Sequence, residues 1–296
     1  MAELHLRRRI VHFVEGIGAV FIYMLFRALP LEAASGLGGW LARTIGPRLA
    51  ISRRALKNLQ RAMPEIGEDR GQRIILGMWD NLGRVVAEYP HLGKYQVYDE
   101  GGRIEIRGAE HIRAQRAYGK RAIFFSGHFG NWEVPTLAVT QAGLGVVEMY
   151  RAPNNPFVDR LINAARSVVG SELAAKGSGG ARRMLAAMRD GRHIAMLIDQ
   201  KSNDGIAVPF FGRDAMTTPS LAVFARRFDC AVIPVRVDRL PRARFRITVE
   251  PPLPMRHTTD ADADALANMT TVNQVLERWV RERPDHWFWL HRRWPD

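Results

Sequence analysis

The chain of 296 residues has a single cysteine, Cys230, and fewer acidic than basic residues. One cysteine excludes an intrachain disulfide and a zinc site built from several cysteines. Only 30 Asp and Glu residues stand against 43 Lys and Arg residues, which gives a net charge of +13. This balance favours anionic partners such as a phospholipid surface, a phosphorylated lipid, an acidic protein or nucleic acid. The hydrophobic share of 47% is ordinary for a globular protein.

The sequence also lacks an uncharged apolar run of about 20 residues, the length that an independent membrane span needs. The best candidate covers residues 10–29 and follows Arg7-Arg8-Arg9. Its uncharged core, from Gly16 to Phe26, is short because Glu15 interrupts the apolar region, and no signal-peptide cleavage site follows. We predict a membrane-anchoring helix over residues 1–30, either a marginal span or a helix in the interface. The alternative is an amphipathic helix packed on the domain.

From Arg103 onward, apolar runs of strand length alternate with segments of helical periodicity. The expected strands are residues 104–106, 122–126, 146–151, 193–198, 231–237 and 245–249. The expected helices are residues 52–63, 71–88, 111–118, 132–142, 157–169, 181–189, 219–228 and 261–283. The alternation predicts an α/β fold with a mixed, largely parallel central sheet flanked by helices, over residues 31–296. The strand at 245–249 is expected at an edge of this sheet.

One stretch, residues 124–133 with the sequence FFSGHFGNWE, joins an expected strand to an expected helix. Gly127 and Gly130 allow a tight turn whose backbone comes close to a ligand. His128 therefore lies where the strand ends, and Glu133 lies in the first turn of the helix. The start of a helix favours negative charge, whether from Glu133 or from a developing oxyanion.

The spacing of His128 and Glu133 depends on that junction. Residues five apart on a straight helix lie about 140° apart and do not meet, whereas a strand, turn and helix can bring them together. We expect Glu133 to hydrogen-bond one imidazole nitrogen and so to fix the tautomer, which leaves the other nitrogen as a base. The alternative is that both residues are purely structural.

Further polar residues fall where other strands end. Arg151 follows one strand, and Asp199-Gln200 follows another, so parallel strands would bring them to the edge that carries His128. Arg166 lies in the helix after Asn154-Asn155-Pro156. The planar fork of arginine suits a phosphate or a thioester oxyanion. The alternative for each arginine is a solvated surface position.

Two apolar segments have more than one interpretation. Phe210 and Phe211, within the sequence VPFFG, could line an acyl-chain groove or plug the core. The C-terminal residues 287–294 mix tryptophans with Arg292 and Arg293, and such mixtures suit lipid headgroups or phosphate binding. The alternative for this tail is a segment packed on the domain.

Taken in order, these segments resemble the bacterial late lipid A acyltransferases of the lauroyl/myristoyl type, within the wider lysophospholipid acyltransferase group. The resemblance rests on GHFGNWE at 127–133, MYR at 149–151, NNP at 154–156, Arg166 with Gly170, DQ at 199–200, VPFFG at 208–212 and WLHRRW at 289–294. Ordered segments over most of the chain are far more specific than any one of them.

The resemblance implies an acyltransferase domain at residues 31–296, on the cytoplasmic face of the inner membrane and held there as a peripheral or single-pass protein. His128 would be the general base, Glu133 its partner, and Arg166 a functional position that stabilises the oxyanion. Acyl carrier protein would be the donor, and a phosphorylated, Kdo-bearing lipid A precursor the acceptor. No metal or other cofactor and no nucleic acid is expected. The candidate substrate-binding residues are Arg151, Asn154, Asn155, Asp199, Gln200, Phe210, Phe211, Arg292 and Arg293.

Two alternatives remain at this level. The acceptor could be another lipid: a lysophospholipid, an aminolipid or a phosphoinositide mannoside. A non-enzymatic basic protein that binds membrane or nucleic acid is the other class, but the basic residues are dispersed and no nucleic-acid module is recognisable.

Overall fold

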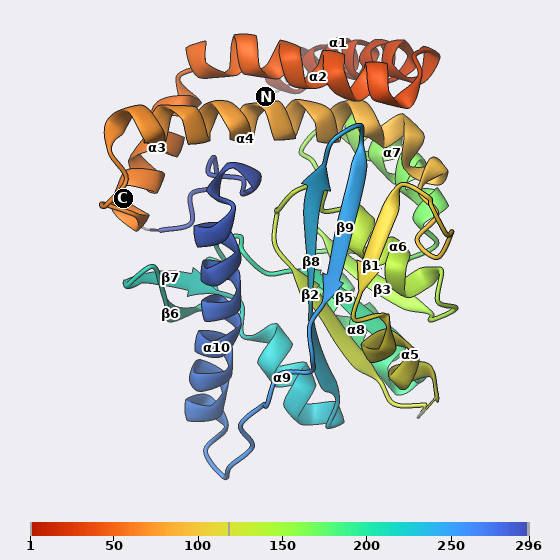
Figure 1. The fold of residues 1–296 in the computed structure, drawn as a ribbon, viewed down its shortest axis with the longest axis vertical. Helices are drawn as coiled ribbons and strands as arrows, with labels where there is room; N and C mark the ends of the chain where they lie inside the picture. The colour runs from red at the N-terminus through yellow and green to blue at the C-terminus, as the bar shows by residue number, and fades with distance from the viewer. Residues whose placement is uncertain (1, 118, 295–296) are drawn as a thin grey trace.

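The computed structural model describes residues 2–117 and 119–294. A seven-stranded sheet forms its centre, and Figure 1 shows how the helices surround this sheet. Its strand order is β1-β9-β8-β2-β5-β3-β4. The bounds are β1 Ile104–Arg107, β2 Ala122–Ser126, β3 Val146–Tyr150, β4 Glu172–Ala175, β5 His193–Leu197, β8 Ala231–Leu240 and β9 Arg244–Val249. Every neighbouring pair is parallel except β8 and β9, so the expected mixed, largely parallel sheet is confirmed.

Helices cover both faces of this sheet and one end of it. The first four are α1 Ala2–Ala28, α2 Leu31–Ile45, α3 Ile51–Ala62 and α4 Glu68–Glu88, and α1, α2 and α4 lie across the top of the sheet in Figure 1. The others are α5 Ala109–Ala117, α6 Val134–Thr140, α7 Pro156–Arg166, α8 Ser178–Arg189, α9 Ser220–Phe228 and α10 Ala261–Glu282. Short 3-10 turns occur at Gly46–Arg48, Tyr89–Lys94, Ser167–Val169 and Pro284–His286.

Strand β2 shows why the central strands are apolar throughout. Successive side chains of a strand point to opposite faces. Ile123 and Phe125 belong to the core that α8, α9 and α10 cover, whereas Ala122 and Phe124 belong to the core under α6. Because both faces are covered, the strand carries no polar alternation, as is usual for buried parallel strands.

The structure differs from the sequence-based expectation in four strands. Strand β9 is an interior strand between β1 and β8, so the expected edge position is wrong, and β1 forms that edge. The short edge strand β4 and a separate hairpin of β6 Ile206–Phe210 and β7 Arg213–Thr217 were not expected. The two-residue hairpin loop has positive φ at both Phe211 and Gly212. A phenylalanine at the first of these positions conceals the Asn-Gly or Asp-Gly signal that usually marks such a turn.

Helix α1 contacts the domain along one side and exposes apolar residues on the other. Its segment Arg9–Ala28 is long and apolar enough to cross a membrane, by length and composition alone. The contact side rests on α7: Asn155 donates to the carbonyl of His12 and to Glu15, and Phe13 meets Phe157 edge-on. The helix is therefore partly docked on the domain, and the anchor remains a proposal.

Candidate active site

The turn after β2 is held from several sides. Gly130 has a φ of 55°, and a Cβ there would lie 2.6 Å from the carbonyl oxygen of Val237, so glycine is required. The backbone of Gly130 also donates to His286 and accepts from Asn81 on α4. Buried Asn131 donates to Glu88 and accepts from the amide of Glu133. These bonds fix the loop that carries His128.

Asp199 is the carboxylate that contacts the His128 imidazole. His128 Nδ1 lies 2.7 Å from Asp199 Oδ1, and the His128 amide donates to Asp199 Oδ2 over 2.7 Å. The indole of Trp287 donates to Oδ2 as well. Burial opposes charge on Asp199, but His128 and these bonds outweigh it and hold the pKa of the carboxyl below its ordinary value. A carboxylate on Nδ1 directs the other nitrogen, Nε2, toward the substrate side.

Glu133 does not contact His128, so the expected pairing of these two residues is wrong. Its carboxylate accepts from Nε of Arg166 over 2.6 Å and from the hydroxyl of Tyr89 over 2.6 Å. The physical reason is that the buried guanidinium of Arg166 needs a carboxylate partner, and Glu133 at the start of α6 faces it.

Arg166 is shared between two buried carboxylates. Its Nη2 donates to Glu148 on β3 over 2.7 Å, in addition to the bond from Nε to Glu133. Burial raises the pKa of Glu148 to about 7; Arg166 opposes this and Glu133 adds to it. Burial and the Glu133 carboxylate likewise raise the pKa of Tyr89. Two nitrogens of Arg166 are therefore engaged by the carboxylates of Glu133 and Glu148.

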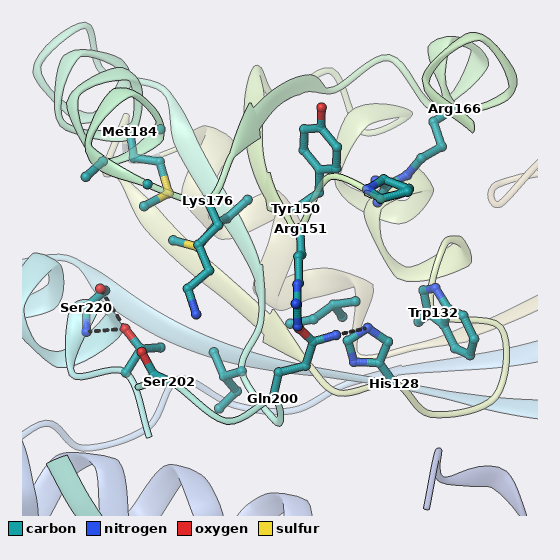
Figure 2. A pocket seen from close by; sticks show the side chains of 18 of the residues that line it. His128, Trp132, Tyr150, Arg151, Arg166, Lys176, Met184, Gln200, Ser202 and Ser220 are labelled. Atoms are coloured by element: carbon teal, nitrogen blue, oxygen red, sulfur yellow. Dashed lines mark hydrogen bonds between the residues drawn. The ribbon is translucent and has the colours of Figure 1, made fainter. Parts of the chain in front are cut away.

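A cavity of about 420 Å³ opens beside His128 at the carboxyl edge of the sheet (Figure 2). Its polar lining includes His128, Glu133, Arg151, Arg166, Lys176 and Gln200. Its apolar lining includes Met149, Ile162, Met184, Leu197 and Ile198. Strands β2, β3 and β5 run parallel, so residues that follow them meet at one edge, as expected. The cavity thus combines a fixed imidazole, cations and an apolar wall.

Several expected binding residues lie outside this lining. Phe210 and Phe211 are buried against Trp294 and Trp289, so they pack in the core and do not line this cavity. Arg293 is fully buried and donates to Met216 and Thr217, because a buried guanidinium must satisfy its donors.

Three further expected residues, Asn154, Asn155 and Arg292, also lie outside the cavity lining. Asn155 caps α7 and holds α1, as its side chain accepts from Phe157 and Val158 and donates to α1. Asn154 and Arg292 are exposed and do not line the cavity. The buried tryptophans at 287, 289 and 294 show that the C-terminal tail packs on the domain.

Two residues that the sequence did not single out belong to the site. The His291 ring lies 4.8 Å from that of His128, and burial, with the neighbouring His128, lowers the pKa of His291 to about 3. Lys176 lines the cavity and directly follows β4, a short strand that the sequence did not predict. His128, Asp199 and His291 bring ligand atoms within 4.8 Å of one another and could hold a metal ion, although the first two already bond each other.

Comparison with known proteins identifies the family of the chain. The model of the bacterial lipid A biosynthesis acyltransferases matches residues 4–296, and the chain belongs to that family. The lipid A biosynthesis lauroyltransferase of Escherichia coli (strain K12) is 26% identical over 286 residues, which cover 94% of this chain and 89% of the relative. The chain is therefore an acyltransferase of lipid A biosynthesis.

Proposed function

We propose that the protein transfers a fatty acyl chain from an acyl-carrier-protein thioester to a hydroxyl of a lipid A precursor, with His128 as general base and Asp199 as its partner. The observation that carries this mechanism is the 2.7 Å contact between Nδ1 and buried Asp199, which leaves Nε2 of His128, beside the cavity, as the nitrogen that accepts the hydroxyl proton. A buried carboxylate both orients an imidazole and stabilises the imidazolium that forms during proton transfer.

The reaction needs two steps at the thioester carbon. The acceptor hydroxyl gives its proton to Nε2 of His128 while its oxygen bonds to the carbonyl carbon, and the π pair moves onto the carbonyl oxygen. The pair then returns, the carbon–sulfur bond breaks, and the thiolate takes the proton from Nε2. No serine or cysteine nucleophile is required, so donor and acceptor bind together in a ternary complex.

The cavity and surface suit these substrates. The apolar wall of Met149, Met184 and Leu197 fits a hydrocarbon chain, and the cations Arg151 and Lys176 fit a phosphorylated substrate. A net charge of +13 suits an acidic carrier protein and an anionic membrane surface. We place the protein at the cytoplasmic face of the inner membrane, where exposed apolar residues of α1 would hold it.

His128→Ala and Asp199→Asn test the proposal in purified protein. We expect His128→Ala to abolish transfer without unfolding, and Asp199→Asn to lower kcat by at least about a hundredfold because the tautomer is no longer fixed. The assay measures transfer of dodecanoyl chains from acyl carrier protein to a Kdo-bearing lipid A precursor. Wild-type turnover in folded His128→Ala would exclude this mechanism.

Mass spectrometry of lipid A identifies the acceptor. Cells that lack the gene should lose one secondary acyl chain, and the wild-type gene should restore it, whereas the gene for His128→Ala should not. Unchanged lipid A together with a change in another lipid class would assign the acceptor to that class.

A further inference from the structure

Gln200 contacts Nε2 of the His128 imidazole, the ring nitrogen that Asp199 does not bind. Its Nε2 lies 3.2 Å from Nε2 of His128, the contact drawn as a dashed line in Figure 2. Nδ1 carries the hydrogen that bonds Asp199, so Nε2 is an acceptor and the glutamine amide is the donor. Two consecutive residues, Asp199 and Gln200, therefore hold opposite nitrogens of one ring.

The glutamine amide occupies the place that the acceptor hydroxyl needs. A hydroxyl that transfers its proton to His128 must lie within hydrogen-bond distance of Nε2, about 2.6–3.2 Å. The amide nitrogen of Gln200 now lies at that distance. When the hydroxyl binds, the amide must move aside, but its attachment directly after buried Asp199 keeps it near the ring. A hydroxyl at Nε2 attacks a carbonyl carbon close to the same nitrogen, so an amide that stays near the ring can reach the carbonyl oxygen.

We propose that Gln200 is a catalytic residue whose side-chain N–H stabilises the oxyanion of the tetrahedral intermediate. This inference rests on the proposed acyl transfer. Gln200 lines the cavity, is partly buried and follows the parallel strand β5. Arg166 also lines the cavity, but its Nε and Nη2 bond Glu133 and Glu148. The amide nitrogen of Gln200, by contrast, contacts Nε2 of His128, the nitrogen that must accept the proton of the acceptor hydroxyl.

A different role for Gln200 makes the opposite prediction. If the amide only covered Nε2 in the empty enzyme, it would compete with the acceptor, and its removal would leave turnover unchanged or raise it. If the amide donates to the oxyanion, its removal withdraws an interaction made only in the transition state. Such a loss lowers kcat and leaves substrate binding nearly unchanged.

Gln200→Met and Gln200→Glu separate these roles. Methionine keeps the size but has no N–H, and glutamate keeps the shape but replaces the donor by an acceptor. We expect kcat of each variant to fall by about a hundredfold to a thousandfold, as for loss of one oxyanion donor. Binding of a dodecyl thioether of acyl carrier protein, which has no carbonyl, should change by less than about threefold.

Gln60→Ala is the matched control, because Gln60 is exposed on α3 away from the cavity lining, and its turnover should equal that of wild type. A kcat of Gln200→Met or Gln200→Glu within about threefold of wild type, or above it, overturns the proposal. If one variant fails to bind the thioether, the other decides. Activity in His128→Ala would refute the proposed base, whereas an inactive His128→Ala beside an active Gln200→Met refutes only the role of Gln200.

Discussion

Glu148 shows what a buried group beside the site does to the stability of the fold. Its carboxylate shares Arg166 with Glu133, and the hydroxyl of Ser171 also donates to it. Burial raises the pKa of Glu148 from 4.5 to about 7, despite Arg166 and with help from Glu133. Folded protein therefore binds the Glu148 proton more tightly than unfolded protein does. The stability that this gives is complete below pH 4.5 and is lost as the pH rises through 7.

We predict that Glu148→Gln reduces this loss. The carboxylate costs roughly 3 kcal/mol of unfolding free energy once it is ionised, and an uncharged amide removes that cost. Urea unfolding of both proteins at pH 5 and pH 8 measures the effect, and the difference between the proteins cancels other titrating groups. The wild type should lose about 2–3 kcal/mol more than Glu148→Gln between these pH values. Equal losses would contradict the raised pKa.

The site was only partly predictable from sequence for a reason visible at His128. The strand, glycine turn and helix around His128 are local features that the sequence predicts, although α6 begins at Val134, so Glu133 caps the helix and does not lie in its first turn. The partner of the imidazole, Asp199, is 71 residues away in sequence. The two residues meet because β2 and β5 are neighbours in the sheet. Local periodicity does not determine strand order. The sequence therefore places Asp199 at the correct edge of the sheet but does not predict its contact with Nδ1 of His128.

At the scale of elements, periodicity predicts most helices and strands, but it misses β4 and the β6–β7 hairpin and does not tell which strands are neighbours. The ten-residue strand β8 pairs with both β2 and β9, so the central sheet depends on long-range pairing. The N-terminal helices α2 and α4 show a second long-range feature. They cross so closely at Gly38 and Gly83 that a Cβ at Gly83 would lie 2.1 Å from the Gly38 oxygen. Glycine here serves close packing between helices and no special backbone angle.

Gly83→Ala should therefore destabilise the protein. The added methyl group meets backbone that cannot turn away, and such overpacking typically costs about 1–3 kcal/mol. Gly36→Ala on α2 is the control, since a Cβ there has open space and alanine favours helix by up to about 1 kcal/mol over glycine. Thermal unfolding should lower Tm for Gly83→Ala and keep or raise it for Gly36→Ala. The same direction in both variants would contradict the close crossing.

At the scale of the whole molecule, α1 connects the surface to the site through α7. Asn155 bonds α1 and begins the helix that ends at Arg166. The docked side of α1 thus has a structural role, while its other side exposes apolar residues such as Val14 and Phe21. Deletion of α1 would remove both functions together. Substitutions on the exposed side test membrane attachment alone.

Val14→Glu combined with Phe21→Glu should release the protein from membranes. Val14 and Phe21 are 62% and 68% exposed, so the charges disturb no core packing. Burying each side chain in the acyl region is worth about 1.5–3 kcal/mol, so the vesicle partition coefficient should fall at least about a hundredfold. Flotation with phosphatidylglycerol-containing vesicles measures this. Val223→Glu, at an apolar position on α9 that is 50% exposed, should float like wild type. If the double variant also floats like wild type while remaining folded, the exposed face of α1 does not hold the protein on the bilayer.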